Sequence, residues 1–431
     1  MINWTHAGVA LAVFAASYVL FITGWVHRAI AAMIGGALMV IFGAHMGFFS
    51  HEQAIEAVDM DTIGLLMGMM ILVALLEETG FFRYVAIRCA KATRGSPWRL
   101  MVIFGLVTTF VSMMIDNVST IVFIAPVTIL IAEILRISPV PALIAEALLS
   151  HVGGVGTLVG DPPNIMIASA TGLTFNQFLV NMFPIVVVML AASILLLRWL
   201  FRKKLAEQPQ NVESLNKLRE QDAITDRRKL RKCLCALGLT LVLFLLHGVT
   251  HLPPAACTLI GATLALTLVR PDPTGVLAKV EWPVLIFFAG LFVIVGGVDS
   301  AGVLQIVGEK AAGFAHTSPA IAVTAVLWIS AFFSMTIGNI PTAASLIPVV
   351  GYMQTLGVET NALWWALAVG AGFGGSASPY AAAANVITIS ISERTKTPIS
   401  FGQWLRVGVP ITLVSCALSN IILVLVHLHL H

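Results

Sequence analysis

Four short motifs place polar side chains and helix-breaking residues inside otherwise apolar stretches. Their asparagine, threonine and serine side chains supply neutral hydrogen-bond donors and acceptors, and two aspartates add carboxylates. Polar groups at membrane depth are costly and are usually functional, so the motifs predict a binding site for a small solute. The motifs are Asp116-Asn117-Val118-Ser119-Thr120, Gly338-Asn339-Ile340-Pro341-Thr342, Gly153–Asn164 (GGVGTLVGDPPN) and Gly370–Asn385 (GAGFGGSASPYAAAAN).

The motifs form two pairs, one member in each half of the chain. Phe110–Thr120 and Phe332–Thr342 share Phe, Ser, Met, Ile, Asn and Thr in one register. Gly153–Asn164 and Gly370–Asn385 share a Gly-Gly and a following Asn. This self-similarity indicates an internal repeat, and we expect the two pairs to meet near mid-membrane.

Only the first half supplies carboxylates to the motifs. Gly338 and Ala382 stand where the first half has Asp116 and Asp161. A carboxylate at this depth can load and release a proton or stay ionised around a cation, so both are candidate coupling residues. The alternative is that each only caps the end of a broken helix. His151 on the same segment is a candidate proton relay, or else a hydrogen-bonded structural residue.

The elements that must carry these motifs are membrane helices. Among the 431 residues, 58% are apolar and 10% are charged, far below the roughly 25% charged residues of soluble domains. Continuous apolar runs favour helices over the alternating strands of a barrel. Consecutive glycines and a Pro-Pro interrupt the predicted spans 142–170 and 361–391, so we expect both to break in the middle.

Each half is predicted to contain five spans and one re-entrant hairpin. The first-half spans are 7–25, 30–48, 62–79, 142–170 and 178–200, and the hairpin is 100–135 with its turn near Asp116–Thr120. An odd number of spans inverts the second copy, which is the organisation of a secondary transporter. The predicted fold is an all-α polytopic membrane protein with a first repeat at 1–201, a cytoplasmic linker at 202–232 and an inverted repeat at 233–431.

Charge fixes the predicted orientation. The basic residues other than Lys310 are assigned to one side, which the positive-inside bias makes the cytoplasm. We therefore expect a multi-pass protein of a bacterial inner membrane, with the linker cytoplasmic and both termini periplasmic. The five cysteines match no disulfide framework and no metal or redox motif.

At these motifs the chain resembles the ArsB/NhaD permeases of the ion transporter superfamily, especially the branch with the melanosomal P protein. The resemblance implies scaffold and transport parts, homodimerisation and elevator-like movement. It also implies a substrate site at the hairpin tips and broken helices. The matching positions are Asn117, Thr120, Thr157, Asn164, Asn339, Thr342, Ser376, Ser378 and Asn385, beside the coupling candidates Asp116, Asp161 and His151.

The predicted function is proton-coupled efflux of arsenite or antimonite, whose neutral, oxygen-rich hydroxides suit Asn, Thr and Ser. A sodium/proton antiporter and a permease for another small anion are the alternatives. No buried Arg or Lys appears in the motifs to hold a carboxylate, and no nucleophile lies beside a base, so an enzyme is not expected. No cofactor, resident metal or nucleic-acid partner is expected beyond the coupling proton or sodium. The partners are a small inorganic substrate, the lipid bilayer, a second copy of the chain and, as a candidate, a soluble ATPase subunit.

Overall fold

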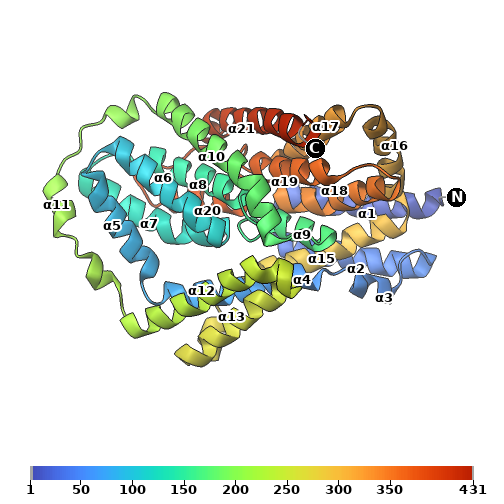
Figure 1. The fold of residues 1–431 in the computed structure, drawn as a ribbon, viewed down its shortest axis with the longest axis horizontal. Coiled ribbons are helices and arrows are strands. Elements are labelled where there is room, and N and C mark those ends of the chain that lie inside the picture. Colours follow the sequence, from blue (N-terminus) through green and yellow to red (C-terminus); the bar gives the residue numbers. More distant parts are fainter. Residues whose placement is uncertain (1–2, 430–431) are drawn as a thin grey trace.

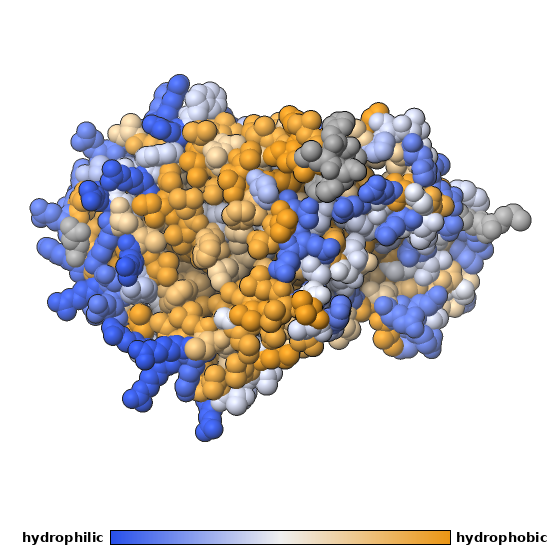
Figure 2. Space-filling model, in the orientation of Figure 1, coloured by the Kyte–Doolittle hydropathy of each residue, from blue (hydrophilic) through white to orange (hydrophobic). Residues whose placement is uncertain are grey.

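A computed structural model describes residues 3–429, and this range is helical without a β-strand. Ten of its helices are long and apolar enough to cross a membrane. Figure 2 shows a broad apolar band between two hydrophilic ends. The linker helix α11 (Val212–Lys217) lies at one of these ends and the N-terminus at the other (Figure 1). The predicted all-helical polytopic fold is confirmed.

The spans predicted for the first half are present with shifts of a few residues. The helices of this half are α1 (Trp4–Thr23), α2 (Arg28–Met46), α3 (His51–Glu56), α4 (Met60–Glu77), α5 (Phe81–Thr93), α6 (Pro97–Met114), α7 (Asn117–Leu135), α8 (Val140–Val155), α9 (Pro162–Thr171) and α10 (Phe175–Leu200).

The second half repeats this order of elements. Its helices are α12 (Arg227–Thr250), α13 (Pro254–Val269), α14 (Pro273–Leu277), α15 (Trp282–Ser300), α16 (Val303–Thr317), α17 (Pro319–Ile337), α18 (Asn339–Thr355), α19 (Asn361–Gly374), α20 (Ala383–Ser392) and α21 (Phe401–His429). In Figure 1, α8 and α20 lie toward the end with α11, while α9 and α19 lie toward the opposite end. This arrangement agrees with an inverted second copy, and the repeat boundaries stay a prediction.

Both hairpins form as a pair of antiparallel arms. A β-carbon on Gly95, just before α6, would lie 3.5 Å from Leu135 Cδ2 at the end of α7. The two ends of the hairpin therefore meet at the same end of the molecule, although each arm alone is long enough to be counted as a span. In the second half, α17 and α18 take the same places, joined at Gly338.

Both predicted broken helices are broken. The first span is interrupted between α8 and α9, and the second between α19 and α20. Pro162 and Pro163 open α9, where a missing N–H has no intrahelical partner to lose. Each break falls after a Gly-Gly, and each lies beside the hairpin tip of its own half.

Besides the short helices α3 and α14, two longer helices were not predicted. The amphipathic helices α5 and α16 link the third span of each half to its hairpin. Gly80 and Gly302 precede them with φ of 77° and 78°, a left-handed conformation that glycine adopts without strain. Both helices are short and carry charged residues, so no apolar run of spanning length marks them in the sequence.

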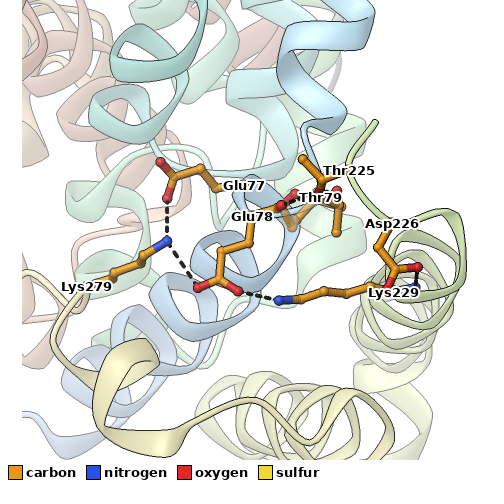
Figure 3. Close-up of polar contacts among 8 residues, drawn as sticks. Glu77, Glu78, Thr79, Thr225, Asp226, Lys229 and Lys279 are labelled. Atoms are coloured by element: carbon orange, nitrogen blue, oxygen red, sulfur yellow. Dashed lines mark hydrogen bonds and ion pairs between the residues drawn. The ribbon is translucent and has the colours of Figure 1, made fainter. Parts of the chain in front are cut away.

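The linker packs along one end of the molecule rather than hanging free. It contains the short helices η1 (Lys204–Ala206), α11 and η2 (Glu220–Ala223), and its last residues already belong to α12. Thr225 N–H donates to Thr79 O at 3.1 Å, and Lys229 pairs with Glu78 at the end of α4 (Figure 3). Lys279 completes this cluster at 3.2 Å from Glu78.

Candidate functional site

The first hairpin tip is built against the break between α8 and α9. The Asn117 side chain is 5% exposed, and its Oδ1 accepts a hydrogen bond from Ser112 Oγ on the other arm. A β-carbon on Gly154 would lie 2.6 Å from Asn117 Oδ1, so only glycine permits this approach. The Asp116 carboxylate accepts from Ser119 N at 2.8 Å and Ser119 Oγ at 2.6 Å, which makes it the N-cap of α7.

The second tip is joined to the first half by Asp161. Asn339 Nδ2 donates to Asp161 Oδ1 at 3.0 Å, and Asp161 is 1% exposed. The Asp161 side chain does not cap α9, although the residue stands at its N-cap position. Its Oδ2 has no hydrogen-bond partner among the described residues. Asp161 therefore reaches across the two halves, while Asp116 stays within its own tip.

Asn164 and Asn385 clamp the two breaks in the same way. Asn164 Nδ2 donates to Gly154 O at 3.1 Å and Thr157 O at 2.8 Å. Asn385 Nδ2 donates to the equivalent carbonyls of Gly375 and Ser378, at 2.7 and 2.9 Å. These bonds satisfy carbonyls that a broken helix leaves free. Two residues predicted to bind substrate thus also hold the backbone of the site.

His151 crosses between the halves as Asp161 does. His151 Nε2 lies 2.9 Å from Asn385 Oδ1, and the ring is fully buried. Because Asn385 Nδ2 is committed to two carbonyls, its oxygen faces the ring, so Nε2 must carry the proton. The hydrogen-bonded role is therefore present in the structure, and a proton-relay role stays a prediction. Gly372 occupies the equivalent position in the second half, and Asn164 Oδ1 has no partner among the described residues.

The predicted threonine and serine residues lie at the hairpin tips and the breaks, and those with a hydrogen bond described below donate to backbone carbonyl groups. Thr157 Oγ1 donates to Met113 O at 2.6 Å, and Ser378 Oγ donates to Met335 O at 3.0 Å. Thr120 and Thr342 each donate to the carbonyl four residues earlier. Ser376 is 2% exposed on the second break. Their oxygens remain possible acceptors for a ligand, since a hydroxyl has two lone pairs.

Residues outside the four motifs reach the hairpin tips from other helices. Tyr18 on α1 donates to Pro341 O at 3.0 Å, and Arg28 on α2 donates to Tyr380 O at 2.7 Å. Glu281 directly precedes α15. Burial, with Asp116 as a second cause, raises the pKa of Glu281 to about 7. No motif marks these residues, because their importance depends on which helices pack against the tips.

An acidic cavity of about 810 Å³ lies between the α3–α4 loop, α9, α15 and α18. In Figure 1, α3 lies at the end of the molecule opposite α11. Its lining includes Glu56, Asp59, Asp61 and Asp299 and contains no Lys or Arg. Ser169 Oγ on α9 donates to Asp59 Oδ1 at 2.9 Å. Met166 extends the lining to within one turn of Asn164 on the same helix.

The comparisons with known proteins agree with this architecture. A family model described as a citrate transporter, CitMHS, matches residues 18–370. The chain belongs to the CitMHS family. An uncharacterized transporter of Mycobacterium tuberculosis is 42% identical over 421 residues, covering 96% of this chain and 97% of the relative. This CitMHS protein is therefore a membrane transporter and not an enzyme.

A further relative and a solved structure are also similar to this chain. The human P protein is 30% identical to the CitMHS chain, covering 98% of it and 60% of the P protein. The predicted likeness to the P protein is confirmed, whereas the wider placement among ArsB/NhaD permeases stays a prediction. The crystal structure of the YdaH transporter of Alcanivorax borkumensis superposes with a TM-score of 0.62 at 14% identity, covering 93% of this chain and 98% of that one. At this identity the likeness concerns the fold alone.

Proposed function

We propose that this protein is a secondary active transporter in which Asp161 couples proton movement to transport of a small, oxygen-rich solute. The observation that carries the proposal is the Asp161–Asn339 hydrogen bond, because it links a buried carboxylate of one half to the hairpin tip of the other. Its second oxygen has no partner among the described residues and can take a proton or a cation. Binding of a proton or a cation to Asp161 Oδ2 would change the hydrogen bond between Asp161 and Asn339 at the second tip.

Proton-coupled efflux of arsenite or antimonite is the substrate assignment that follows from the neutral groups at the site. Asn117, Asn164 and Asn385 present amide groups, and Thr157 and Ser378 present hydroxyl oxygens. Such groups can bind a neutral trihydroxide without a fixed charge. Sodium/proton exchange remains the alternative in which Asp161 and Asp116 bind sodium instead of a solute-coupled proton.

A small carboxylate is the second candidate substrate. It is favoured by the presence of Arg28 beside the second tip and by the description of the family as citrate transporters. The absence of a cation from the four motifs argued against carboxylates, but a cation from another helix reaches the site. The four motifs alone therefore do not exclude a carboxylate substrate.

The orientation is part of the proposal. We place the end with α5, α11 and the Glu78 cluster in the cytoplasm, because the basic linker lies there. The acidic cavity then faces the periplasm and serves as an outer vestibule. In this arrangement the protein is a multi-pass protein of the inner membrane.

Everted membrane vesicles loaded with a proton-sensitive dye test the coupling. Arsenite, antimonite, citrate and sodium are added separately, and we expect one of the three solutes, rather than sodium, to move protons. Asp161→Asn should abolish the response, whereas Glu133→Gln, an exposed carboxylate on α7, should keep it. A response to sodium alone would establish the antiporter alternative, and an unchanged response in Asp161→Asn would remove Asp161 from the coupling role.

A further inference from the structure

Arg28 lies where the α1–α2 corner meets the second hairpin tip. It is the first residue of α2, and its Nη2 donates to Tyr380 O, in the break between α19 and α20, at 2.7 Å. A β-carbon on Gly338 would lie 3.9 Å from Arg28 Nη1. Tyr18 supports the same corner, with its hydroxyl 2.7 Å from Ser345 Oγ on α18. Arg28, a cation that lies outside the four motifs, is thus held between the second hairpin tip and the loop that joins α19 to α20.

No carboxylate among the described residues pairs with this cation. The ion pairs found within residues 3–429 involve Lys91, Lys229 and Lys279 and lie near the linker. Arg28 is partly buried, and one backbone carbonyl is its hydrogen-bond partner in the described part of the chain. A guanidinium has several N–H donors in a planar fork that fits a carboxylate. Burial of an unpaired charge is costly, so an anion bound to this partly buried guanidinium would stabilise the site.

The two tips differ where an anion would lie. At the first tip the Asp116 carboxylate accepts two hydrogen bonds from Ser119. At the second tip the equivalent residue is Gly338, with φ of 102° and no side chain. The N–H of Ile340 is already bonded to Asn339 Oδ1, and Pro341 has none, so the backbone offers little to an anion there. The guanidinium of Arg28 is the group that can hold one.

We propose that Arg28 is the anion-recognising residue of the transport site, and that it receives a carboxylate group of the substrate beside Gly338. The proposal rests on the proposed transport function and narrows it to small carboxylates. Arg28 belongs to α2, whereas Gly338 and Tyr380 belong to a hairpin tip and a helix break. Movement of these elements relative to α2 would therefore make and break the contact with the substrate.

Citrate binding to the purified full-length protein tests this assignment without requiring transport. Thermal unfolding is followed in detergent over a series of citrate concentrations, for wild type, Arg28→Gln, Arg28→Lys and Arg231→Gln. Arg231 is an exposed arginine of α12, outside both hairpin tips and both breaks, so it controls for loss of one positive charge. Each variant is also measured without citrate to confirm that it is folded.

We expect Arg28→Gln to raise the citrate concentration for half-maximal stabilisation by about 10- to 100-fold, the range of a charge-assisted hydrogen bond. Arg28→Lys should lie between, because it keeps the charge and loses the planar fork. Arg231→Gln should match wild type. Equal citrate stabilisation in wild type and Arg28→Gln, or none in wild type, would overturn the assignment and leave Arg28 as a cation at the start of α2 that only joins this helix to the break between α19 and α20.

The vesicle assay separates this failure from failure of the proposed function. Arsenite-driven proton movement that is unchanged in Arg28→Gln, with no citrate response in wild type, would refute the carboxylate assignment while supporting a proton-coupled carrier. Citrate binding that depends on Arg28, with no proton movement for any solute, would support Arg28 and refute proton coupling at Asp161.

Discussion

Replacement of Asn164 by alanine tests whether this residue holds the backbone or binds only substrate. Its amide group donates to three carbonyls of the first break, at 2.8, 3.1 and 3.3 Å, and the side chain is 1% exposed. An amide has two N–H hydrogens, so at least two of these carbonyls would lose a partner in Asn164→Ala. Each buried group left unsatisfied costs about 1–3 kcal/mol. For two such carbonyls we expect a loss of about 2–6 kcal/mol in the free energy of unfolding.

Thermal unfolding of the detergent-purified variants measures the effect. Asn385→Ala should be destabilised at least as much, because it removes two carbonyl bonds and also leaves His151 Nε2 without its acceptor. Asn181→Ala is the matched control. That side chain bonds one carbonyl of its own helix, Gln177 O at 2.7 Å, and its loss should cost about 1 kcal/mol or less.

An unfolding temperature of Asn164→Ala equal to that of wild type would refute the role of Asn164 in holding the backbone of the first break. If that variant were also inactive in transport, Asn164 would be a substrate ligand whose bonds to the backbone carry little energy. Loss of stability with recovery of transport at low temperature would instead identify the residue as a clamp of the break.

Three further predictions concern titratable groups. Asp161→Asn should make the transport rate independent of pH. Asp161→Ala should in addition lower the unfolding temperature, because alanine removes the acceptor for Asn339 whereas asparagine keeps one. Equal unfolding temperatures of the two variants would contradict a stabilising Asp161–Asn339 hydrogen bond. Because the pKa of Glu281 is raised to about 7, the folded state binds its proton more tightly, and stability should fall as pH rises from about 4.5 to 7. Glu281→Gln should flatten this part of a pH series of unfolding temperatures. Partial burial raises the pKa of the Glu78 carboxyl, but hydrogen bonds from Lys229 and Lys279 lower it further than burial raises it. The cluster therefore stabilises the folded state at pH values above the ordinary carboxyl pKa, and this stabilisation is lost as the pH falls. Lys229→Gln should cost about 1 kcal/mol at pH 7 and nothing near pH 3, as judged by denaturant unfolding.

The spans, the breaks and the hairpins were predictable because each depends on local composition. Apolar runs of sufficient length can cross the bilayer, the glycines at the end of α8 weaken its last turn, and Pro162-Pro163 can only begin a new helix. The first hairpin is predictable because Arg94 and Arg99 before it and Arg136 after it all favour the cytoplasmic side, which a single crossing would not allow. The helices α5 and α16 were missed since an amphipathic helix at the interface has no run of spanning length.

Sequence alone determined the paired motifs and their asymmetry, because identity and register are properties of the chain. It could not determine their partners. Asp161 bonds Asn339, His151 bonds Asn385, and Arg28 reaches Tyr380, and each bond joins residues far apart in the chain. Such contacts depend on how the helices of one half pack against those of the other. The sequence therefore established which residues are polar at membrane depth, and only the tertiary structure decided which of them meet and which charge faces the second tip.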